Sequence, residues 1–354
     1  VACFIKLPWL YAEAYDPLDP NGNITIKWDV IQWTPDGYVA VVSLYNYQQY
    51  RHIQAPGWKL GWVWAKKEII WAMTGGQATE QGDCSKFKSN IPHCCKKDPE
   101  VVDLLPGTPY NMQIANCCKG GVLTAWAQDP EHAVASFQVS VGQAGTTNKT
   151  VKVPKNFTLK APGPGGNSPY LASVVNDPNT NSLAPLVQCT SHMCPIRVHW
   201  HVKVNYKEYW RVKITVTNFN YRMNYSQWNL VAQHPNFDNL TTIFSFNYKS
   251  LNPYGLINDT AMLWGIKYYN DLLMTAGPDG NVQSELLFRK EPSTFTFQKG
   301  WAFPRRVYFN GDNCVMPPPD AYPWLPNTSP RQSASLLLTF AAVWAALVVL
   351  LAHA

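Results

Sequence analysis

The stretch GWKLGWVWAKKEIIW, Gly57 to Trp71, decides the fold of the first half of the chain. It holds four tryptophans: Trp58, Trp62, Trp64 and Trp71. Alternate residues of a β-strand share a face, so the first three indoles are predicted to point to one side, together with Leu60. If the two lysines that follow turn the chain, Trp62 lies opposite Trp71, and Trp64 lies opposite Ile69, as cross-strand pairs.

A strand face with three indoles has two interpretations. In the first, the rings are core, each burying about 150–250 Å². In the second, rings two positions apart, roughly 7 Å, form a platform on which the C–H face of a sugar stacks. A crystalline glucan presents many sugar rings in one plane, so several weak contacts add up. The candidates for binding such a glucan are Trp33, Tyr38, Tyr45, Trp58, Trp62, Trp64 and Trp71, and Trp28, Tyr47 and Tyr50 are further candidates.

Strand periodicity continues on both sides of this stretch. Alternating runs such as NITIKWDVIQW and SFQVSVGQ are separated by turn groups such as TPDG and KGG, and a second such region contains IRVHWHVKVNY and YWRVKITVTNF. Aromatic residues make up 13% of the 354 residues, with 28 prolines and 21 glycines. The sequence therefore predicts an all-β fold of two antiparallel, sandwich-like regions joined by a linker rich in proline and glycine. Only residues 258–274, NDTAMLWGIKYYNDLLM, have helical character over more than a few turns.

These patterns divide the chain into six segments. They are the remnant of a secretory signal (1–14), a first β domain (15–160), a linker (161–187), a second β domain (188–316), a proline-rich stalk with a lipid-attachment region (317–335) and a hydrophobic tail (336–354).

The two ends of the chain predict export and a lipid anchor. Near the start, an apolar stretch precedes Ala12-Glu13-Ala14, a small-x-small pattern at which cleavage would free Tyr15. An ordinary buried first strand is the alternative. Near the end, small residues and a polar spacer precede an almost uncharged terminus, the pattern of a glycosylphosphatidylinositol (GPI) signal that anchors a protein in the outer leaflet of the plasma membrane. Asn327 is the predicted attachment residue, Ser329 is the alternative, and a tail-anchored helix is the other interpretation of the terminus.

The cysteines also favour an exported protein. Without Cys3, which lies in the predicted signal, an even number remains for disulfides: Cys84, Cys94, Cys95, Cys117, Cys118, Cys189, Cys194 and Cys314. The doublets HCCKK and NCCKGG lack the CxxC spacing of zinc sites. Because a bridge between adjacent residues strains the backbone, each doublet is predicted to send its two sulfurs to different partners. Predicted N-glycosylation sites are Asn23, Asn148, Asn156, Asn224, Asn239 and Asn258.

No motif predicts an enzyme, a cofactor or a metal site. A glycoside hydrolase needs two carboxylates across the scissile bond, and no acidic residue has a recognisable catalytic setting; among those considered are Asp29, Asp36, Asp129, Glu131, Asp271 and Glu285. His192, His199 and His201 would suit a transition metal, but a Cys189–Cys194 bridge beside ordinary strand histidines is the favoured interpretation. The net charge of +6 lies in small clusters, which disfavours nucleic acid and would tolerate acidic polysaccharides or anionic lipid.

Long segments of the chain resemble the plant COBRA-like family, in particular its brittle-culm type. They include YDPLDPNGNITIKWDV, APGWKLGWVWAKKEIIW, TEQGDCSKFKSNIPHCCKKDP, HMCPIRVHWHVKVNYKEYWRVKIT and WAFPRRVYFNGDNCVMPPPDAYP, and they cover nearly all of residues 15–335. The resemblance implies a GPI-anchored extracellular protein with an N-terminal region like a carbohydrate-binding module. It further implies cellulose binding and a role in the deposition, orientation or crystallinity of microfibrils.

The chain departs from the family in its centre. The family carries a cysteine-rich region with a CCVS motif after APGPG, whereas here Gly165 runs directly into GNSPYLASVV and no CCVS occurs. The expected function is a non-enzymatic cell-surface protein that stacks aromatic residues on cellulose. An adhesion or receptor ectodomain with a protein ligand, and a glycoside hydrolase, are the alternatives.

Overall fold

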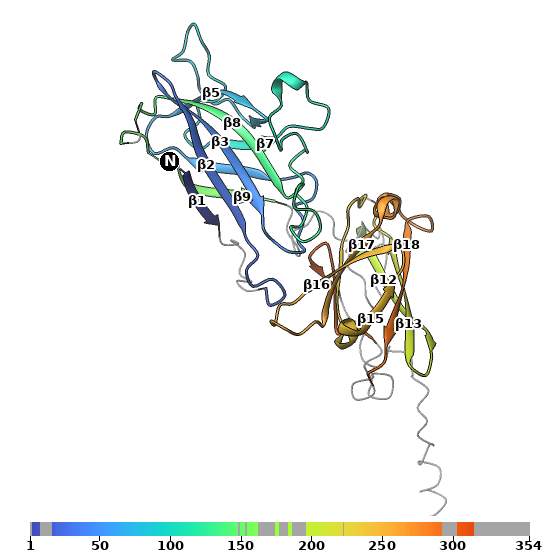
Figure 1. The fold of residues 1–354 in the computed structure, drawn as a ribbon. Coiled ribbons are helices and arrows are strands. Elements are labelled where there is room, and N and C mark those ends of the chain that lie inside the picture. The colour runs from blue at the N-terminus through green and yellow to red at the C-terminus, as the bar shows by residue number, and fades with distance from the viewer. Residues whose placement is uncertain are drawn as a thin grey trace, which may run out of the picture.

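The computed structural model describes residues 16–147, 149–152, 154–161, 196–221, 223–291 and 303–314, together with the backbone of 2–7, 174–176 and 183–185. Within these residues nearly all regular structure is antiparallel β-sheet, so the all-β prediction is confirmed. The strands gather into two bodies, an N-terminal one in blue and green and a C-terminal one in yellow to red (Figure 1). Among the described residues, no helix is long and apolar enough to cross a membrane.

The N-terminal half contains two sheets. Their strands are β1 (Ala2–Leu7), β2 (Ile24–Trp33), β3 (Gly37–Asn46), β4 (Lys59–Val63), β5 (Ile69–Thr74), β6 (Gly76–Ala78), β7 (Glu100–Asp103), β8 (Val134–Gly142) and β9 (Lys155–Lys160), with one short 3-10 helix, η1 (Tyr110–Met112). One sheet has the order β1-β2-β3-β8-β5 and the other β6-β7-β4-β9. β1 pairs along its whole length with β2, as the first-strand interpretation expects, and the predicted cleavage site after Ala14 lies outside the described residues.

The C-terminal half is a second pair of sheets. Its strands are β12 (Ile196–Asn205), β13 (Tyr209–Asn218), β14 (Leu230–Gln233), β15 (Leu240–Ile243), β16 (Phe246–Leu251), β17 (Thr260–Gly265), β18 (Asn281–Arg289), β19 (Arg306–Phe309) and β20 (Asp312–Asn313). The sheets run β12-β13-β18-β15 and β16-β17-β14-β19-β20, and a small β10 (Val174–Asn176) to β11 (Leu183–Pro185) pair lies between the halves in sequence.

The short helices of the C-terminal half are η2 (Pro235–Asn239), η3 (Lys267–Asn270) and η4 (Leu272–Met274). The prediction of helical character over residues 258–274 is therefore wrong for the first part of this segment. Thr260–Gly265 instead forms a strand that pairs with β14 on one side and β16 on the other.

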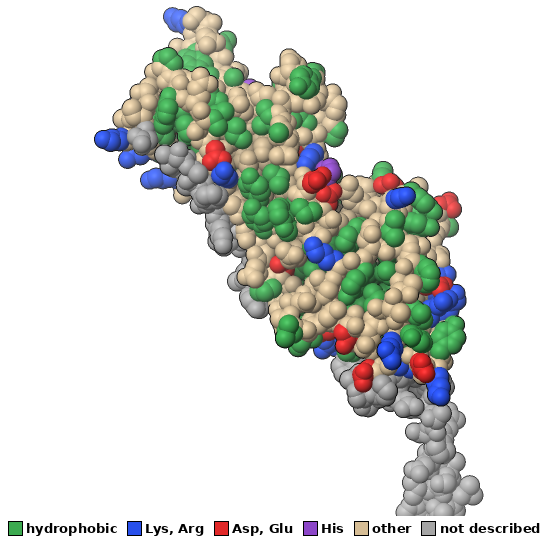
Figure 2. Space-filling model, in the orientation of Figure 1, with side chains coloured by type: hydrophobic (Ala, Val, Ile, Leu, Met, Phe, Trp, Pro, Cys, Tyr) green, Lys and Arg blue, Asp and Glu red, His purple; other side chains and the backbone are tan. Residues whose placement is uncertain are grey.

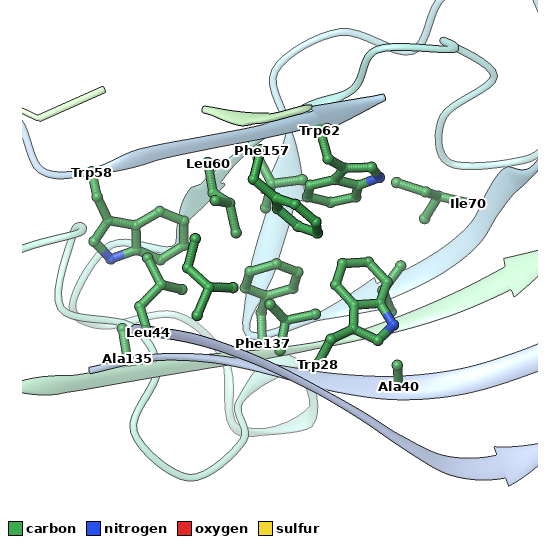
Figure 3. Close-up of a cluster of buried hydrophobic side chains, with 14 of the residues drawn as sticks. Trp28, Ala40, Leu44, Trp58, Leu60, Trp62, Ile70, Ala135, Phe137 and Phe157 are labelled. Carbon is green, nitrogen blue, oxygen red and sulfur yellow. The ribbon is translucent and has the colours of Figure 1, made fainter. Parts of the chain in front are cut away.

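A tryptophan cluster fills the space between the two N-terminal sheets. Trp28 of β2 meets Trp62 and Trp64 of the opposite sheet edge to face, with ring centroids 5.3 and 6.1 Å apart. Phe137 of β8 stacks on Trp62, and Phe157 of β9 closes the cluster against Trp28. Figure 3 shows Trp58, Leu60 and Trp62 pointing from one sheet toward Trp28, Leu44 and Phe137 of the other.

The predicted hairpin within Gly57 to Trp71, in which Trp62 would lie opposite Trp71, is wrong. β4 pairs with β7 and β9, whereas β5 lies in the other sheet beside β8, so Trp62 is not opposite Trp71. The Lys66–Lys67 turn carries the chain from one sheet to the other instead of reversing it within one sheet. The alternation itself is correct, because Trp58, Leu60, Trp62 and Trp64 are all buried in the same core.

Close backbone approach fixes the start of β4. Gly57 has φ of +90° and Gly121 has φ of +77°, a region that L side chains rarely adopt. A Cβ on Gly57 would lie 2.2 Å from the carbonyl oxygen of Gly120, so a side chain has no room there. The N–H of Trp58 donates to the carbonyl oxygen of Gly121, which ties the KGG turn to the first tryptophan of the core.

The cysteine doublets differ from each other and from their prediction. Cys95 bridges Cys84, while Cys94 is a free, buried thiol. Alternation explains this difference, because Cys94 pairs through its backbone with Ile70 and belongs to the core, where no second cysteine lies among the described residues. Cys314 is buried and disulfide-bonded, and Cys189 and Cys194 lie outside the described residues.

Cys117 and Cys118 bridge each other, so the prediction of different partners is wrong for this doublet. The local backbone brings the adjacent sulfurs together. Cys118 has φ of 69°, and the buried carboxylate of Asp103 accepts the N–H groups of Cys118, Lys119 and Gly121 at 2.8–2.9 Å.

The two halves meet in a buried junction. Its apolar part is a cluster of residues from both halves: Leu18, Tyr50, Ala125, Ala127, Val231, Leu251, Met262 and Tyr308. At its polar part, the Asn229 amide nitrogen lies 3.0 Å from the carbonyl oxygen of Tyr50 and 2.7 Å from Nε2 of His52. Arg51 pairs with Asp16 at 3.0 Å and also donates to the carbonyl oxygen of Gly311 at 2.7 Å. The halves therefore share a core and a hydrogen-bond network.

Two titratable groups near this junction have shifted pKa values of opposite sign. Burial lowers the pKa of His52 to about 4, and Nδ1 of the ring accepts the N–H of Ala125. Burial raises the pKa of Asp19 to about 6, although its carboxylate accepts the N–H of Gln49.

Replacing Trp62 with alanine tests the core. Loss of a fully buried indole is expected to lower the free energy of unfolding by about 3–5 kcal/mol. The matched control is Trp33→Ala, because Trp33 is 41% exposed and its loss leaves no comparable cavity. Urea unfolding followed by tryptophan fluorescence measures both, and equal effects of the two substitutions would contradict the assignment of Trp62 to the core.

The two shifted pKa values predict compensating pH effects on stability. The unfolded chain protonates His52 below about 6.5 and the folded chain only below about 4, so this group makes folding less favourable as pH falls through that window, by up to about 3 kcal/mol. Asp19 acts in the opposite sense: its contribution is present below the unfolded pKa of 3.8 and is lost as pH rises through about 6. Asp19→Asn should therefore steepen the loss of stability on acidification, and His52→Gln should reverse the slope. Urea titrations across this pH window measure the slopes, and a profile that neither substitution changes would refute both assignments.

Candidate carbohydrate-binding surface

Four of the predicted cellulose-binding residues lie in the core. Trp58, Trp62, Trp64 and Tyr38 are each exposed by 2% or less. Their rings face the opposite sheet, because β4 and the inward positions of β3 close the sandwich over them. This part of the prediction is wrong, and Trp28 and Tyr50 are buried as well.

The burial of these indoles depends on apolar area rather than on hydrogen bonds. Among the described residues, the ring N–H groups of Trp58, Trp62 and Trp64 find no acceptor. An unpaired buried donor costs about 1–3 kcal/mol. Burying about 150–250 Å² of ring at about 25 cal/mol per Å² contributes roughly 4–6 kcal/mol, which exceeds that cost. The rings are therefore stable in a dry core.

A different group of rings lies on the solvent side of the sheet that contains β3. Tyr45 and Tyr47 follow each other at alternate positions at the end of β3, and their rings are stacked with centroids 5.6 Å apart and an interplanar angle of 4°. Trp126, from the loop before β8, lies against Tyr47 with a centroid distance of 4.7 Å and a tilt of 58°. All three side chains are half-buried. We call these three residues the aromatic ledge.

Polar groups surround the ledge. Thr25 lies opposite Tyr45 across the β2–β3 pair, and its hydroxyl donates to Oδ1 of Asn23 at 2.7 Å. Further along the outer face of β2, Lys27 and Asp29 form an ion pair of 2.7 Å. Hydrophobic side chains gather on the N-terminal half next to its junction with the C-terminal half (Figure 2). The outer side of this sheet therefore combines flat rings with charged and hydroxyl groups, the mixture that a sugar surface requires.

The remaining two candidates lie at the other end of β3. Trp33 is 41% exposed and meets Tyr38 edge to face at 6.3 Å. Trp71 is half-buried, donates its ring N–H to Asp36 at 3.0 Å and contacts Phe87 at 5.4 Å. Of the seven candidates, Tyr45, Trp33 and Trp71 thus keep ring surface in solvent. Of these three, only Tyr45 is stacked on another ring.

Sequence reasoning missed Trp126. It lies in TAWAQDP, a loop with no alternation, so no periodic signal marked it. Its position follows from backbone hydrogen bonds, because its N–H donates to the carbonyl oxygen of Gln48 just beyond β3. Such a long-range bond between a loop and a strand end has no signature in local sequence.

The predicted glycosylation sites that the structure describes reach the surface. Asn156 and Asn224 are exposed, and Asn23, Asn239 and Asn258 are half-buried. Asn148 and the predicted attachment residue Asn327 lie outside the described residues, so these sites stay predictions.

The acidic and histidine residues considered for chemistry have other neighbours. Asp29 pairs with Lys27, Asp36 accepts from Trp71, Asp129 contacts His132, and Glu285 pairs with Lys203 and Arg211. In the described part of the chain, no group of three or more His, Cys, Asp and Glu side chains converges on one point. His199 and His201 stand on an exposed strand face, and His192 lies outside the described residues.

Comparison with known proteins identifies the family. The model of the COBRA N-terminal domain matches residues 38–206, and the model of the COBRA family C-terminal domain matches residues 143–323. COBRA-like protein 1 of Oryza sativa subsp. japonica is 72% identical over 421 residues, covering 97% of this chain and 94% of the relative. Protein COBRA of Arabidopsis thaliana is 60% identical over 407 residues, covering 92% of this chain and 89% of the relative.

These alignments are longer than the chain itself. An alignment of 421 residues against a chain of 354 means that the relative carries residues without a counterpart here. This excess agrees with the absence of a CCVS motif from the sequence. With two family models matched and relatives aligned over nearly its whole length, the chain belongs to the COBRA family.

Proposed function

We propose that the chain is a non-enzymatic glycoprotein of the cell surface and wall that binds cellulose through the aromatic ledge. Bound there, it organises cellulose microfibrils as the wall forms. The observation that carries the proposal is the pair of parallel, half-buried rings of Tyr45 and Tyr47 with Trp126 beside them. Membership of a family whose relatives are named COBRA and COBRA-like supports a role in the cell wall.

The chemistry of the ledge suits a neutral glucan. The C–H face of a sugar ring is apolar and binds a flat aromatic ring by dispersion and partial-charge attraction, without any charged group. The hydroxyl groups at the rim of the sugar need donors and acceptors, which Lys27 and Asp29 offer on the neighbouring strand. A crystalline surface repeats the same sugar face, so each weak contact is reinforced by the next.

The anchor is part of the same proposal. A GPI lipid on Asn327 would hold the protein in the outer leaflet of the plasma membrane, where new cellulose chains emerge from the cell. The ledge lies on the N-terminal half and the predicted attachment residue follows the C-terminal half in the chain, so the binding half need not contact the lipid.

Retention on crystalline cellulose tests the ledge. The triple variant Tyr45→Ala, Tyr47→Ala, Trp126→Ala loses three stacking contacts at roughly 0.5–1.5 kcal/mol each, so its affinity should fall about tenfold or more. The matched control replaces three exposed tyrosines elsewhere, Tyr110, Tyr206 and Tyr254, with alanine and should bind as the parent protein does. Both variants must unfold cooperatively near the parent temperature, because the ledge lies outside the core.

Three results would contradict the proposal. They are no retention of the parent protein, equal retention of the ledge variant, or retention lost only in the control variant. Release of soluble oligosaccharides from cellulose, abolished by replacing one carboxylate, would favour the hydrolase alternative. Capture of a protein ligand without any polysaccharide retention would favour the adhesion alternative.

Glycosylation at Asn23 is expected to modulate this binding. The carbonyl oxygen of Asn23 accepts the N–H of Tyr47, so a glycan on Asn23 would begin beside the ledge and compete for it. Asn23→Gln should therefore increase cellulose retention of protein made in a glycosylating host, whereas Asn224→Gln on the C-terminal half should not. In a host that does not attach glycans, the Asn23 variant and the parent should bind equally; a difference there would point to the substitution itself.

A further inference from the structure

One face of the C-terminal half carries an unusual set of charges. The strands β12, β13, β18 and β15 form a four-stranded sheet whose inner side packs on the second core. Seven arginine, lysine and histidine side chains lie at outward positions of these strands or at the β12 bulge: Arg197, His199, His201, Lys203, Arg211, Lys213 and Arg289. We call this set the basic face. Glu285 is the one acidic side chain at an outward position of these four strands.

The cations form two adjacent rows. Alternate positions of a strand are roughly 7 Å apart, so Arg197, His199 and His201 line the exposed side of the edge strand β12. The rings of His199 and His201 are parallel to within 25°, with centroids 6.0 Å apart. On β13, Lys213 lies directly opposite His201.

Most of this charge is not neutralised within the sheet. Glu285 pairs with Lys203 at 2.5 Å and with Arg211 at 3.1 Å, so its single charge is already shared by two cations. Within the described residues, neither Arg197 nor Lys213 forms an ion pair. Arg197 instead lies over the ring of Phe219 at 4.9 Å. The face therefore keeps a net positive charge at neutral pH.

The charges on this face act on one another. Burial, together with the neighbouring His201, Arg197 and Lys213, lowers the pKa of His199. A bound anion would oppose that effect and favour the protonated ring. By linkage, anion binding is then stronger at a pH where His199 can protonate.

We propose that the basic face binds a linear polysaccharide that carries carboxylate groups, that is, a polymer of uronic acids. This activity is separate from cellulose binding, because cellulose has no charge for the face to recognise. It assigns a role to the His-Trp-His motif of β12, which the aromatic ledge does not use.

Three features favour this partner over a membrane. The cations follow a strand, so they match a linear polyanion better than a plane of lipid headgroups. Between them lie neutral groups that bond to hydroxyls, namely Thr215 and Gln283 at paired outward positions of β13 and β18. Along the edge strand β12, every outward position from Arg197 to Asn205 carries a polar side chain, and none carries a hydrophobic side chain that would insert into a bilayer.

Binding of the full chain to immobilised polygalacturonate tests the proposal. Retention is expected to rise as the pH falls from about 8 to about 5, because His199 gains charge, and to fall at high salt, which screens exposed charges. The variant Arg197→Gln, His199→Gln, His201→Gln should bind about tenfold more weakly at the lower pH, through loss of three exposed ion pairs. It leaves the Lys203–Glu285–Arg211 group intact.

Two comparisons make the test specific. Glu285→Gln removes the one opposing charge and should strengthen retention, which a merely damaged sheet would not do. Lys86→Gln, Lys88→Gln, Lys155→Gln removes three exposed cations from the N-terminal half and should bind as the parent does. Fully methyl-esterified polygalacturonate keeps the sugar backbone without the charge and should not be retained.

Several results would overturn the proposal. They are equal retention of the esterified polymer, no effect of the triple variant, or equal loss in the lysine control. Binding to vesicles containing phosphatidylserine that the same triple variant abolishes, without retention on polygalacturonate, would assign the face to a membrane instead. The triple variant should keep the cellulose retention of the parent, and the ledge variant should keep its polygalacturonate retention. Failure of one activity is therefore distinguishable from failure of the other.

Discussion

The packing of Trp28 against Trp62 and Trp64 is the contact on which the N-terminal half depends. These indoles come from facing sheets, and their edge-to-face geometry sets how closely the sheets approach. Because the rings are large and dry, no alternative register of β4 buries the same area; a slip of one residue would turn all three tryptophans of this run to solvent. The core thus also decides which residues remain outside. Whatever binds this half must use side chains that the tryptophan cluster leaves unburied.

Strand alternation produces both candidate surfaces in the same way. On β3, Val42 and Leu44 face the core while Tyr45 faces out, and on β12, Val198 and Trp200 face the second core while His199 faces out. One surface is aromatic and suits an uncharged sugar, and the other is cationic and suits an acidic one. A chain in which one half contacts cellulose and the other half contacts a uronic acid polymer would link two kinds of polysaccharide.

The all-β class and the alternating faces could be predicted from sequence because they depend on a period of two, which is a local property. The common face of Trp58, Trp62 and Trp64 followed correctly. The sequence could not predict whether this face points to the core or to solvent. That depends on the position of a second sheet, which the local sequence does not determine. The same limit explains the wrong hairpin: two lysines make a poor tight turn, and nothing in the local sequence marks the crossover to the other sheet. Trp126 could not be found, because a backbone bond to Gln48 brings it to Tyr47. The Cys117–Cys118 bridge was missed because it depends on the positive φ of Cys118 and on Asp103, which lies at the end of β7 and is distant in sequence.

The shared core between the halves has a mechanical consequence. At the junction between the halves, Tyr50 packs against Tyr308, and Asn229 lies beside His52. Bending the molecule there would expose apolar surface and break buried polar contacts. The two halves are therefore expected to move together as one rigid body. If each half binds a polymer as proposed, the fixed arrangement of the halves would set the angle between the two polymers.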